Sequence, residues 1–302
     1  MKILLLGKEG QVGSALECTL DQVGNLLAWD QESADLEQPV DLRAKIRAKA
    51  PDVIVNAAGY TAVDRAESEP DKAYRINAEA VEALASYASE TGTVLIHYST
   101  DYVFDGTKQA PYTETDRPNP LSVYGQSKFA GEEAIRRSGC RHFLLRTSWV
   151  FATEGNNFPR TILKLATERD RLTIVDDQVG APTSARLMAN VTLQILERIK
   201  DGRERLDGVT GTYHVCAQGE TSWYDYARYI MDQARALGFE TRVTPEGITP
   251  VATAEYRQAA RRPPNSRLNT DKLASWLGIR MPPWETEVAR VVREIVLERR
   301  TA

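Results

Sequence analysis

Residues 2–13 read KILLLGKEGQVG, an apolar run that ends at a glycine and continues into a turn with glycines at positions 7, 10 and 13. A short apolar run bounded by glycine predicts a buried parallel strand, and the amphipathic residues 11–20 predict a helix. In a strand–turn–helix unit of this kind, Gly7, Gly10 and Gly13 let the backbone approach a pyrophosphate at the helix N-terminus. The stretch therefore predicts a dinucleotide-binding α/β fold, although three glycines alone also fit an ordinary tight turn.

Strand and helix patterns alternate up to about residue 150, which predicts a doubly wound parallel Rossmann sheet over residues 1–150. Further strands are expected at 25–29, 52–56, 93–101 and 141–147, with helices at 40–50 and 71–90 and around Tyr124. Residues 151–302 are expected to form mainly a smaller C-terminal α/β substrate domain, with some segments returning to the Rossmann domain. In this half we expect helices at 158–168, 184–199, 222–236 and 284–298, strands at 172–175 and 211–216, and a loop at 177–183.

Composition excludes several classes of protein. A formal net charge of −4 over 302 residues argues against a general nucleic-acid binder. The three cysteines are too widely spaced for a disulfide framework or a zinc site, and the three histidines lack metal-ligand spacing, so we expect no metal. No run of about 18 apolar residues and no secretory leader is recognisable, so we expect no membrane contact and a cytoplasmic location.

An acidic residue closes the second predicted strand. Asp30 lies 20 residues after Gly10, where a carboxylate would bind the adenine-ribose hydroxyls of NAD. The same carboxylate would repel the 2′-phosphate of NADP, whereas Lys8 in the glycine turn would attract it. The two residues act in opposite directions, so the choice between NADH and NADPH stays open. A loop aspartate that caps a turn is the alternative interpretation of Asp30.

A tyrosine and a lysine stand four residues apart at Tyr124 and Lys128. In a helix these side chains share one face. A nearby ammonium favours the ionised phenol, so we expect Lys128 to lower the pKa of Tyr124 and make it a better acid–base at neutral pH. Two solvated residues on a helix face are the alternative. Ser99, Thr100 and Asp101 end the fourth strand, where ligands bind in open α/β sheets.

The basic segment 257–267 contains Arg262 and is interrupted by proline. It fits an exposed charged loop and a clamp for a diphosphate equally well.

The chain resembles the dTDP-4-dehydrorhamnose reductase family of the extended short-chain dehydrogenase/reductase superfamily over nearly its whole length. Besides the glycine turn, the motifs that carry the resemblance are Asp52-Val-Ile-Val-Asn-Ala-Ala58, Thr61-Ala-Val-Asp64, Tyr98-Ser-Thr-Asp-Tyr-Val-Phe-Asp-Gly106, Tyr124-Gly-Gln-Ser-Lys128, Arg146-Thr-Ser-Trp-Val150, Gly155-Asn-Asn-Phe158, Asp177-Gln-Val-Gly-Ala-Pro-Thr183, Arg262-Pro263 and Asn265-Ser-Arg-Leu268.

The resemblance implies reduction of dTDP-4-dehydro-L-rhamnose to dTDP-L-rhamnose by NADPH or NADH. It implies that Tyr124 donates a proton to the 4-keto oxygen, Lys128 holds the nicotinamide ribose and Thr100 bonds the keto oxygen. Ser99 is implied near the nicotinamide. Cofactor contacts are implied for Gly7, Gly10, Gln11, Val12, Gly13, Asp30, Asp35, Leu36, Gly59, Tyr60 and Thr61. Contacts with the sugar nucleotide are implied for Thr100, Asp101, Trp149, Asn157 and Arg262.

One departure concerns assembly. Some members of the family dimerise around magnesium held by carboxylates, but the matching positions here are Ala15 and Arg186, with Glu294 as a third. An arginine repels a cation. We therefore expect a monomer or a homodimer without a magnesium bridge.

Two rival functions remain. A non-catalytic regulatory subunit, like that of methionine adenosyltransferase, resembles these reductases, but Thr100, Tyr124 and Lys128 are all present here. A sugar-nucleotide epimerase or dehydratase would regenerate its nicotinamide within each turnover, whereas a reductase consumes it.

Overall fold

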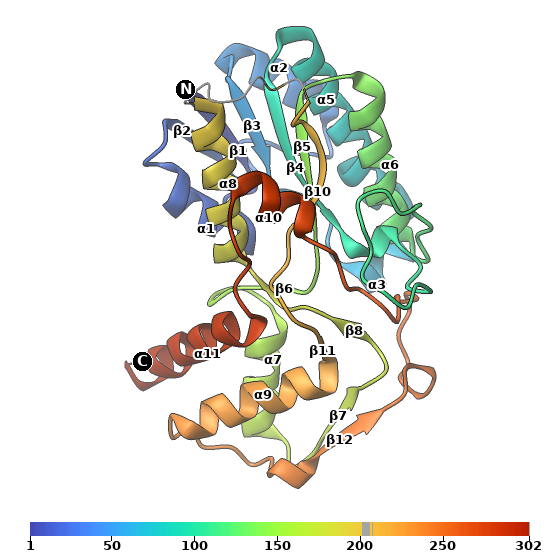
Figure 1. Cartoon of the computed structure of the whole chain (residues 1–302), viewed down its shortest axis with the longest axis vertical. Helices are drawn as coiled ribbons and strands as arrows, with labels where there is room; N and C mark the ends of the chain where they lie inside the picture. The colour runs from blue at the N-terminus through green and yellow to red at the C-terminus, as the bar shows by residue number, and fades with distance from the viewer. Residues whose placement is uncertain (201–205, 207, 302) are drawn as a thin grey trace.

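A six-stranded parallel sheet forms the centre of the computed structural model, which describes residues 1–200, 206 and 208–301 (Figure 1). Its strand order is β10-β5-β4-β3-β1-β2. The strands are β1 (Lys2–Leu6), β2 (Asn25–Trp29), β3 (Val53–Asn56), β4 (Val94–Thr100), β5 (His142–Thr147) and β10 (Gly211–His214). The predicted doubly wound parallel sheet is confirmed, and its sixth strand comes from the second half of the chain.

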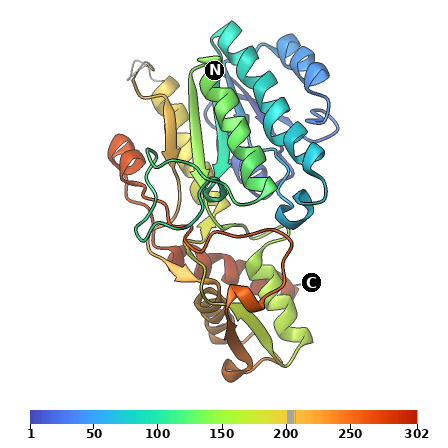
Figure 2. The same cartoon turned by 90° about the vertical axis from the view of Figure 1, so that its right-hand side faces the viewer.

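Helices cover both faces of the sheet, as the continuous apolar strands require. Alternate residues of β1 enter different cores: Ile3 and Leu5 pack on one face, Leu4 and Leu6 on the other. The first face carries α1 (Gln11–Leu20) and α8 (Ala185–Lys200); the second carries α2 (Pro39–Lys49), α5 (Ala80–Thr91) and α6 (Val123–Ser138) (Figures 1 and 2).

A smaller part of the molecule lies beyond the carboxyl ends of the sheet strands (Figure 1). It contains α7 (Phe158–Glu168), α9 (Trp223–Ala236), α11 (Trp284–Thr301) and short sheets made by β6 (Val150–Phe151), β7 (Leu172–Val175), β8 (Val179–Gly180), β9 (Thr183–Ser184), β11 (Thr221–Ser222) and β12 (Ile248–Val251). Parallel pairing of β12 with β7 ties residues 248–251 to this part. The division near residue 150 stays a prediction.

The predicted helix 71–90 is interrupted. The chain forms α4 (Pro70–Tyr74), a π-helical turn (Arg75–Glu79) and then α5. The side chain of Asn77, inside the π turn, bonds the backbone of Tyr60 and the hydroxyl of Ser127. A π turn often marks a functional site, and here its asparagine is used by neighbouring loops. Periodicity alone does not reveal such an insertion.

Several further short elements are not predicted from the sequence. Residues 177–183, expected as a loop, contain β8 and the start of β9. The helices α3 (Val63–Ala66) and α10 (Asp271–Leu277) and strand β12 are too short to show a clear periodicity. No helix in the described part of the chain combines the length and apolarity that crossing a membrane requires.

Candidate active site

The glycine turn between β1 and α1 is built for close backbone contact. Gly7 has φ +82°, and its N–H donates to Trp29 O at 2.9 Å. A Cβ on Gly13 would lie 1.9 Å from Gly7 O, so only glycine lets α1 start this close to the strand. Gly10 is the N-cap of α1 and supplies no side-chain cap. The first N–H groups of the helix are therefore open to an anion such as a pyrophosphate.

Asp30 and Lys8 meet at the end of β2. Lys8 Nζ lies 3.1 Å from Asp30 Oδ2. Ser33 donates to Asp30 Oδ1 from its N–H at 2.9 Å and its hydroxyl at 2.7 Å, and these bonds hold the pKa of Asp30 well below its usual value. The ionised carboxylate thus stands beside the turn, already paired with the cation that would attract a 2′-phosphate.

The other predicted cofactor residues differ in accessibility. Asp35 accepts a hydrogen bond from Glu37 N–H at 2.9 Å, and Leu36 is buried in the core under β1. The backbone of Tyr60 is held by Asn77, its hydroxyl donates to Glu69 at 2.8 Å, and Thr61 is exposed. Leu36 can therefore offer a ligand little besides its backbone. Gln11 and Val12 are half-buried in the first turn of α1.

Thr100 and Asp101 lie side by side at the carboxyl end of β4. The Thr100 hydroxyl donates to Asp101 Oδ1 at 3.1 Å and accepts from Tyr102 N–H at 3.2 Å. Asp101 is buried, and its Oδ2 has no partner. Burial raises the pKa of Asp101 to about 6 despite hydrogen bonds from Ser266 and Thr100. An unpaired buried carboxylate oxygen at this place is suited to accept a ligand hydroxyl.

Helix α6 carries Tyr124 and Lys128 toward the end of β4. Ser122 caps the helix by accepting from Gly125 N–H at 3.2 Å. A Cβ on Gly125 would lie 2.3 Å from Tyr102 O, and one on Gly131 would lie 2.1 Å from Asn77 O. These two glycines let the helix sit directly against the β4 end and the π turn.

The expectation that Lys128 lowers the pKa of Tyr124 is wrong for this structure. Burial raises the pKa of Tyr124 to about 12, and the negative charge of Asp101 adds to the rise, against the hydrogen bond from Thr100. Lys128 Nζ instead donates to Tyr98 O at 2.7 Å and lies 3.3 Å from His97 Nε2. Burial lowers the pKa of Lys128 to about 8. The phenol is thus a fully protonated donor at neutral pH.

Ser99 is engaged away from the site. Its hydroxyl donates to Glu132 Oε1 at 2.6 Å, and Glu132 is held by Arg146 at 2.9 and 2.6 Å. The whole group is buried. The hydroxyl proton of Ser99 is therefore committed to a structural ion pair and is not free for a nicotinamide.

Two predicted substrate residues, Trp149 and Arg262, lie in segments that follow β5. Trp149 has φ +47° and stacks on Trp223 with ring centroids 3.7 Å apart. Arg262 forms an ion pair with Asp64 on α3 at 2.7 Å. Burial raises the pKa of Tyr102, the neighbour of Asp101, and the nearby charge of Arg262 opposes that rise. Backbone strain at a tryptophan and an arginine brought next to the β4 end both favour a ligand-binding role.

Asn157 has a different environment. Its amide nitrogen donates to Gln11 Oε1 at 3.1 Å and to Ala152 O at 2.9 Å, and its oxygen caps α7 through Arg160 N–H. The side chain joins the second half of the chain to the first turn of α1. Its hydrogen-bonding groups are occupied within the protein.

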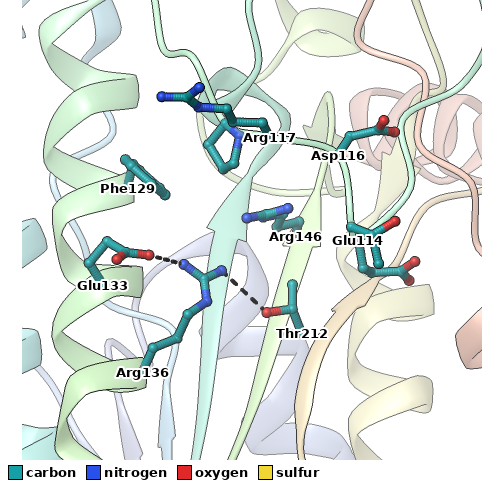
Figure 3. Close-up of a pocket in the computed structure, with 10 residues that line it drawn as sticks. Glu114, Asp116, Arg117, Phe129, Glu133, Arg136, Arg146 and Thr212 are labelled. Carbon is teal, nitrogen blue, oxygen red and sulfur yellow. Dashed lines mark hydrogen bonds and ion pairs between the residues drawn. The ribbon is translucent and has the colours of Figure 1, made fainter.

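A hollow of about 280 Å³ lies beside α6, β5 and β10 (Figure 3). Arg146 stands at its centre in this view, and Arg136 bridges Glu133 and Thr212 along one side. Basic and acidic side chains alternate around it, and none of the predicted site residues lines it. We assign it no role in the chemistry.

The positions relevant to magnesium do not form a site. Glu294 pairs with Arg290 at 2.8 Å, and Arg186 is exposed on α8. Within the ranges that the structure describes, no three His, Cys, Asp or Glu side chains gather as metal ligands would.

Asn56 and His97 were not among the predicted site residues, yet both are buried next to Lys128. Asn56 ends β3 and His97 lies on β4, two strands that pair directly. A polar residue within an apolar strand (His97) or at its end (Asn56) is the only signal in the sequence. It does not reveal which helix the side chain faces.

Comparisons with known proteins agree with this geometry. A family profile described as "RmlD substrate binding domain" matches residues 1–297. The dTDP-4-dehydrorhamnose reductases of Salmonella typhimurium and Escherichia coli K12 are each 46% identical over 299 residues, covering 98% of both chains. The crystal structure of dTDP-4-dehydrorhamnose reductase from Bacillus anthracis in complex with NADP superposes with a TM-score of 0.87 at 31% identity, covering 97% of this chain and 99% of that one.

Proposed function

Because the chain belongs to the dTDP-4-dehydrorhamnose reductase family, we propose that it reduces dTDP-4-dehydro-L-rhamnose to dTDP-L-rhamnose with NADPH or NADH. It is an oxidoreductase of dTDP-L-rhamnose biosynthesis and catalyses the last step. The observation that carries the assignment of roles is that Thr100, at the carboxyl end of β4, lies beside Tyr124 of α6, next to Lys128.

The residues present fit a nicotinamide dinucleotide. The uncapped start of α1 would hold the pyrophosphate, and Asp30 with Lys8 would meet the adenine ribose or its 2′-phosphate. The bound dinucleotide supplies the hydride that reaches C4 of the sugar. Lys128 and the turn at Gly59 lie close enough to share the nicotinamide ribose, since a Cβ on Gly59 would be 3.8 Å from Lys128 Nζ.

The protein's own side chains stabilise the negative charge that develops on the keto oxygen. As hydride adds to C4, negative charge develops on that oxygen, and a nearby proton donor and hydroxyl stabilise it. Tyr124 stays protonated at neutral pH because burial and Asp101 raise the pKa of its phenol. It therefore gives up its proton only when the strongly basic alkoxide forms. Thr100 would orient the phenol and the keto oxygen.

Substrate contacts are assigned to Asp101, Trp149 and Arg262. The unpartnered Oδ2 of Asp101 would accept a sugar hydroxyl, and the half-buried Trp149 would lie along the sugar. Arg262 would bind the diphosphate by exchanging its Asp64 partner for phosphate oxygens. Asn157 and Ser99 would act by supporting the site, because their polar groups are already bonded within the chain.

The assay follows the loss of reduced-nicotinamide absorbance with dTDP-4-dehydro-L-rhamnose, first with NADPH and then with NADH. Stoichiometric oxidation supports the reductase and ranks the cofactors. Tyr124→Phe should keep the fold and lower kcat roughly 10²–10⁴-fold, the range expected for losing a proton donor. Tyr229→Phe is the matched control, since its hydroxyl donates to Glu285 O, in the smaller part.

No oxidation by a folded, cofactor-binding protein would contradict the proposal and favour a regulatory subunit. Near-normal kcat in Tyr124→Phe would remove the acid role from Tyr124 while leaving the reductase intact. Conversion of the sugar nucleotide without a stoichiometric loss of reduced nicotinamide would favour an epimerase or dehydratase.

Assembly and location are also proposals. We propose a monomer or homodimer without a bridging metal, because Arg186 occupies a position where a carboxylate would be needed. All three cysteines are free thiols, two of them buried, which supports a reducing cytoplasmic environment.

A further inference from the structure

A line of buried polar groups runs behind the candidate active site. Asn56 Nδ2 lies 3.0 Å from His97 Nδ1, and His97 Nε2 lies 3.3 Å from Lys128 Nζ. Asn56 and His97 are 0% exposed and Lys128 is 6% exposed. Bulk water therefore does not reach Asn56 or His97, and each of these two groups must match the donor or acceptor next to it.

The orientation of the Asn56 amide is set by the backbone. Ala58 N–H donates to Asn56 Oδ1 at 3.2 Å, so the oxygen faces Ala58 and the NH₂ group faces His97. Turning the amide over would place two donors, the NH₂ group and Ala58 N–H, against each other. Since an amide nitrogen only donates, His97 Nδ1 must be the unprotonated acceptor.

The tautomer of His97 then follows. Burial holds the pKa of His97 well below its usual value, so the ring is neutral and carries one proton. That proton must sit on Nε2, pointing at Lys128 Nζ. An ammonium has three donors and no acceptor, whereas a neutral amine has a lone pair that can accept this N–H.

We propose that Asn56 and His97 are positioning residues that present a fixed imidazole Nε2–H to Lys128 and so shift its protonation equilibrium toward the uncharged amine in the enzyme before ligands bind. In its amine form, Lys128 would accept from His97, donate to Tyr98 O, and keep one N–H for the ribose side. This inference rests on the proposed function, because it concerns a lysine assigned to that reaction.

The other groups around Lys128 are few. Glu132, one turn further along α6, raises the pKa of Lys128, but its carboxylate is held by Arg146. Tyr124 is one turn earlier on the same helix, and the β4 strand offers only the Tyr98 carbonyl and His97. On the far side of His97, His142 on β5 is neutral because burial lowers its pKa. No free carboxylate among these neighbours holds Lys128 as a cation.

This arrangement suits a reaction that removes a proton from Tyr124 in every turnover. A buried lysine that remained permanently cationic would exchange protons poorly at neutral pH. A lysine that alternates between amine and ammonium can take up a proton from solvent and help restore the phenol. Asn56 and His97 therefore affect the reprotonation of Tyr124 after each turnover and not the hydride step.

The first measurement is the tautomer of His97 by two-dimensional ¹H–¹⁵N NMR of the full-length protein without ligands. The chain has only three histidines, and the other two provide an internal contrast. His214 Nδ1 faces the carbonyls of Tyr112 and Asn269, and His142 Nδ1 faces Cys140 O, so both carry their proton on Nδ1. We expect His97 alone to carry it on Nε2. A His97 protonated on Nδ1, or on both nitrogens at neutral pH, would overturn the proposal.

The second measurement uses Asn56→Asp, which keeps the shape and the acceptor for Ala58 N–H. Its carboxylate would accept from His97 Nδ1–H, so the ring would turn its Nε2 lone pair toward Lys128 and favour the ammonium. In ¹³Cε-lysine NMR, with the Lys128 signal assigned through Lys128→Met, we expect Lys128 to titrate near pH 8 in the wild type and about one pH unit higher in Asn56→Asp.

Unchanged titration of Lys128 in a folded Asn56→Asp protein would contradict the proposal. Both NMR readouts are independent of turnover, so they stand even if the protein proves inactive on the keto sugar. The alkaline limb of kcat/KM should move upward with the Lys128 titration if the reductase assignment also holds. His142→Gln is the control, since it removes a histidine without touching Asn56 or Lys128.

Discussion

Replacing Asp101 with asparagine should stabilise the free protein at neutral pH. Asp101 is 2% exposed, and one of its oxygens has no partner. Burial raises its pKa from 3.8 to about 6. At about 1.4 kcal/mol per pKa unit, keeping this carboxylate ionised costs the fold about 3 kcal/mol at pH 7.

The sign follows from linkage. Because the folded pKa lies above the unfolded value of 3.8, the contribution of Asp101 to stability is fully present below that value and is lost as the pH rises through about 6. Asparagine does not titrate, so Asp101→Asn lacks this loss. Between about pH 4 and about pH 7.5, the wild type should lose about 2.5 kcal/mol of unfolding free energy relative to the variant.

Urea unfolding of both proteins at the two pH values measures this difference by linear extrapolation. Comparing the change with pH, and not the absolute stability, cancels the cost of burying the amide itself. Asp105→Asn is the matched control with the opposite sign. Hydrogen bonds, first of all from Thr107 N–H, lower the pKa of Asp105 to about 2, so its removal should cost stability as the pH rises.

A wild type and an Asp101→Asn variant with parallel pH dependence, within about 0.5 kcal/mol, would refute the reasoning. That result would mean that other groups in the fold offset the cost of burying the ionised Asp101 carboxylate. If the difference appears, Asp101→Asn should also lose activity toward the keto sugar, because a destabilising group in a binding site is retained for its contact with the ligand.

Three other results are expected. Asp30→Ala should raise kcat/KM for NADPH relative to NADH, because it frees Lys8 for the 2′-phosphate and removes the ribose carboxylate; an unchanged ratio would place the adenine ribose elsewhere. Arg262→Ala should raise KM with little change in kcat and cost at most about 1 kcal/mol of stability, since its ion pair with Asp64 is partly exposed. Its control is Arg242→Ala, which breaks a similar ion pair with Asp170 away from the site. Equal KM values in the two variants would mean that Arg262 does not bind the substrate. Sedimentation velocity with and without EDTA should give the same species, whereas dissociation by EDTA would reveal a bridging metal.

Local patterns were enough to predict most of the secondary structure. The strands at 25–29 and 172–175 and the helix at 11–20 have the predicted bounds. The continuous burial of β1 and the glycine spacing after it determine the parallel sheet and its nucleotide turn. The π turn at Arg75–Glu79 and the two-residue strands could not be predicted, because contacts with distant segments hold them and periodicity does not.

The candidate site also has features that the sequence predicts and features that only the tertiary structure decides. The residue types and their order predict Thr100, Tyr124, Lys128 and the glycine turn as site residues from the sequence alone, because strand ends and helical spacing are local properties. The protonation chemistry was decided by tertiary structure. Four-residue spacing put Tyr124 and Lys128 on one face, but burial raised the pKa of the phenol, and the lysine faces His97 and Tyr98 O. Desolvation and hydrogen-bond partners depend on what packs over a group, and segments far apart in the chain supply that covering.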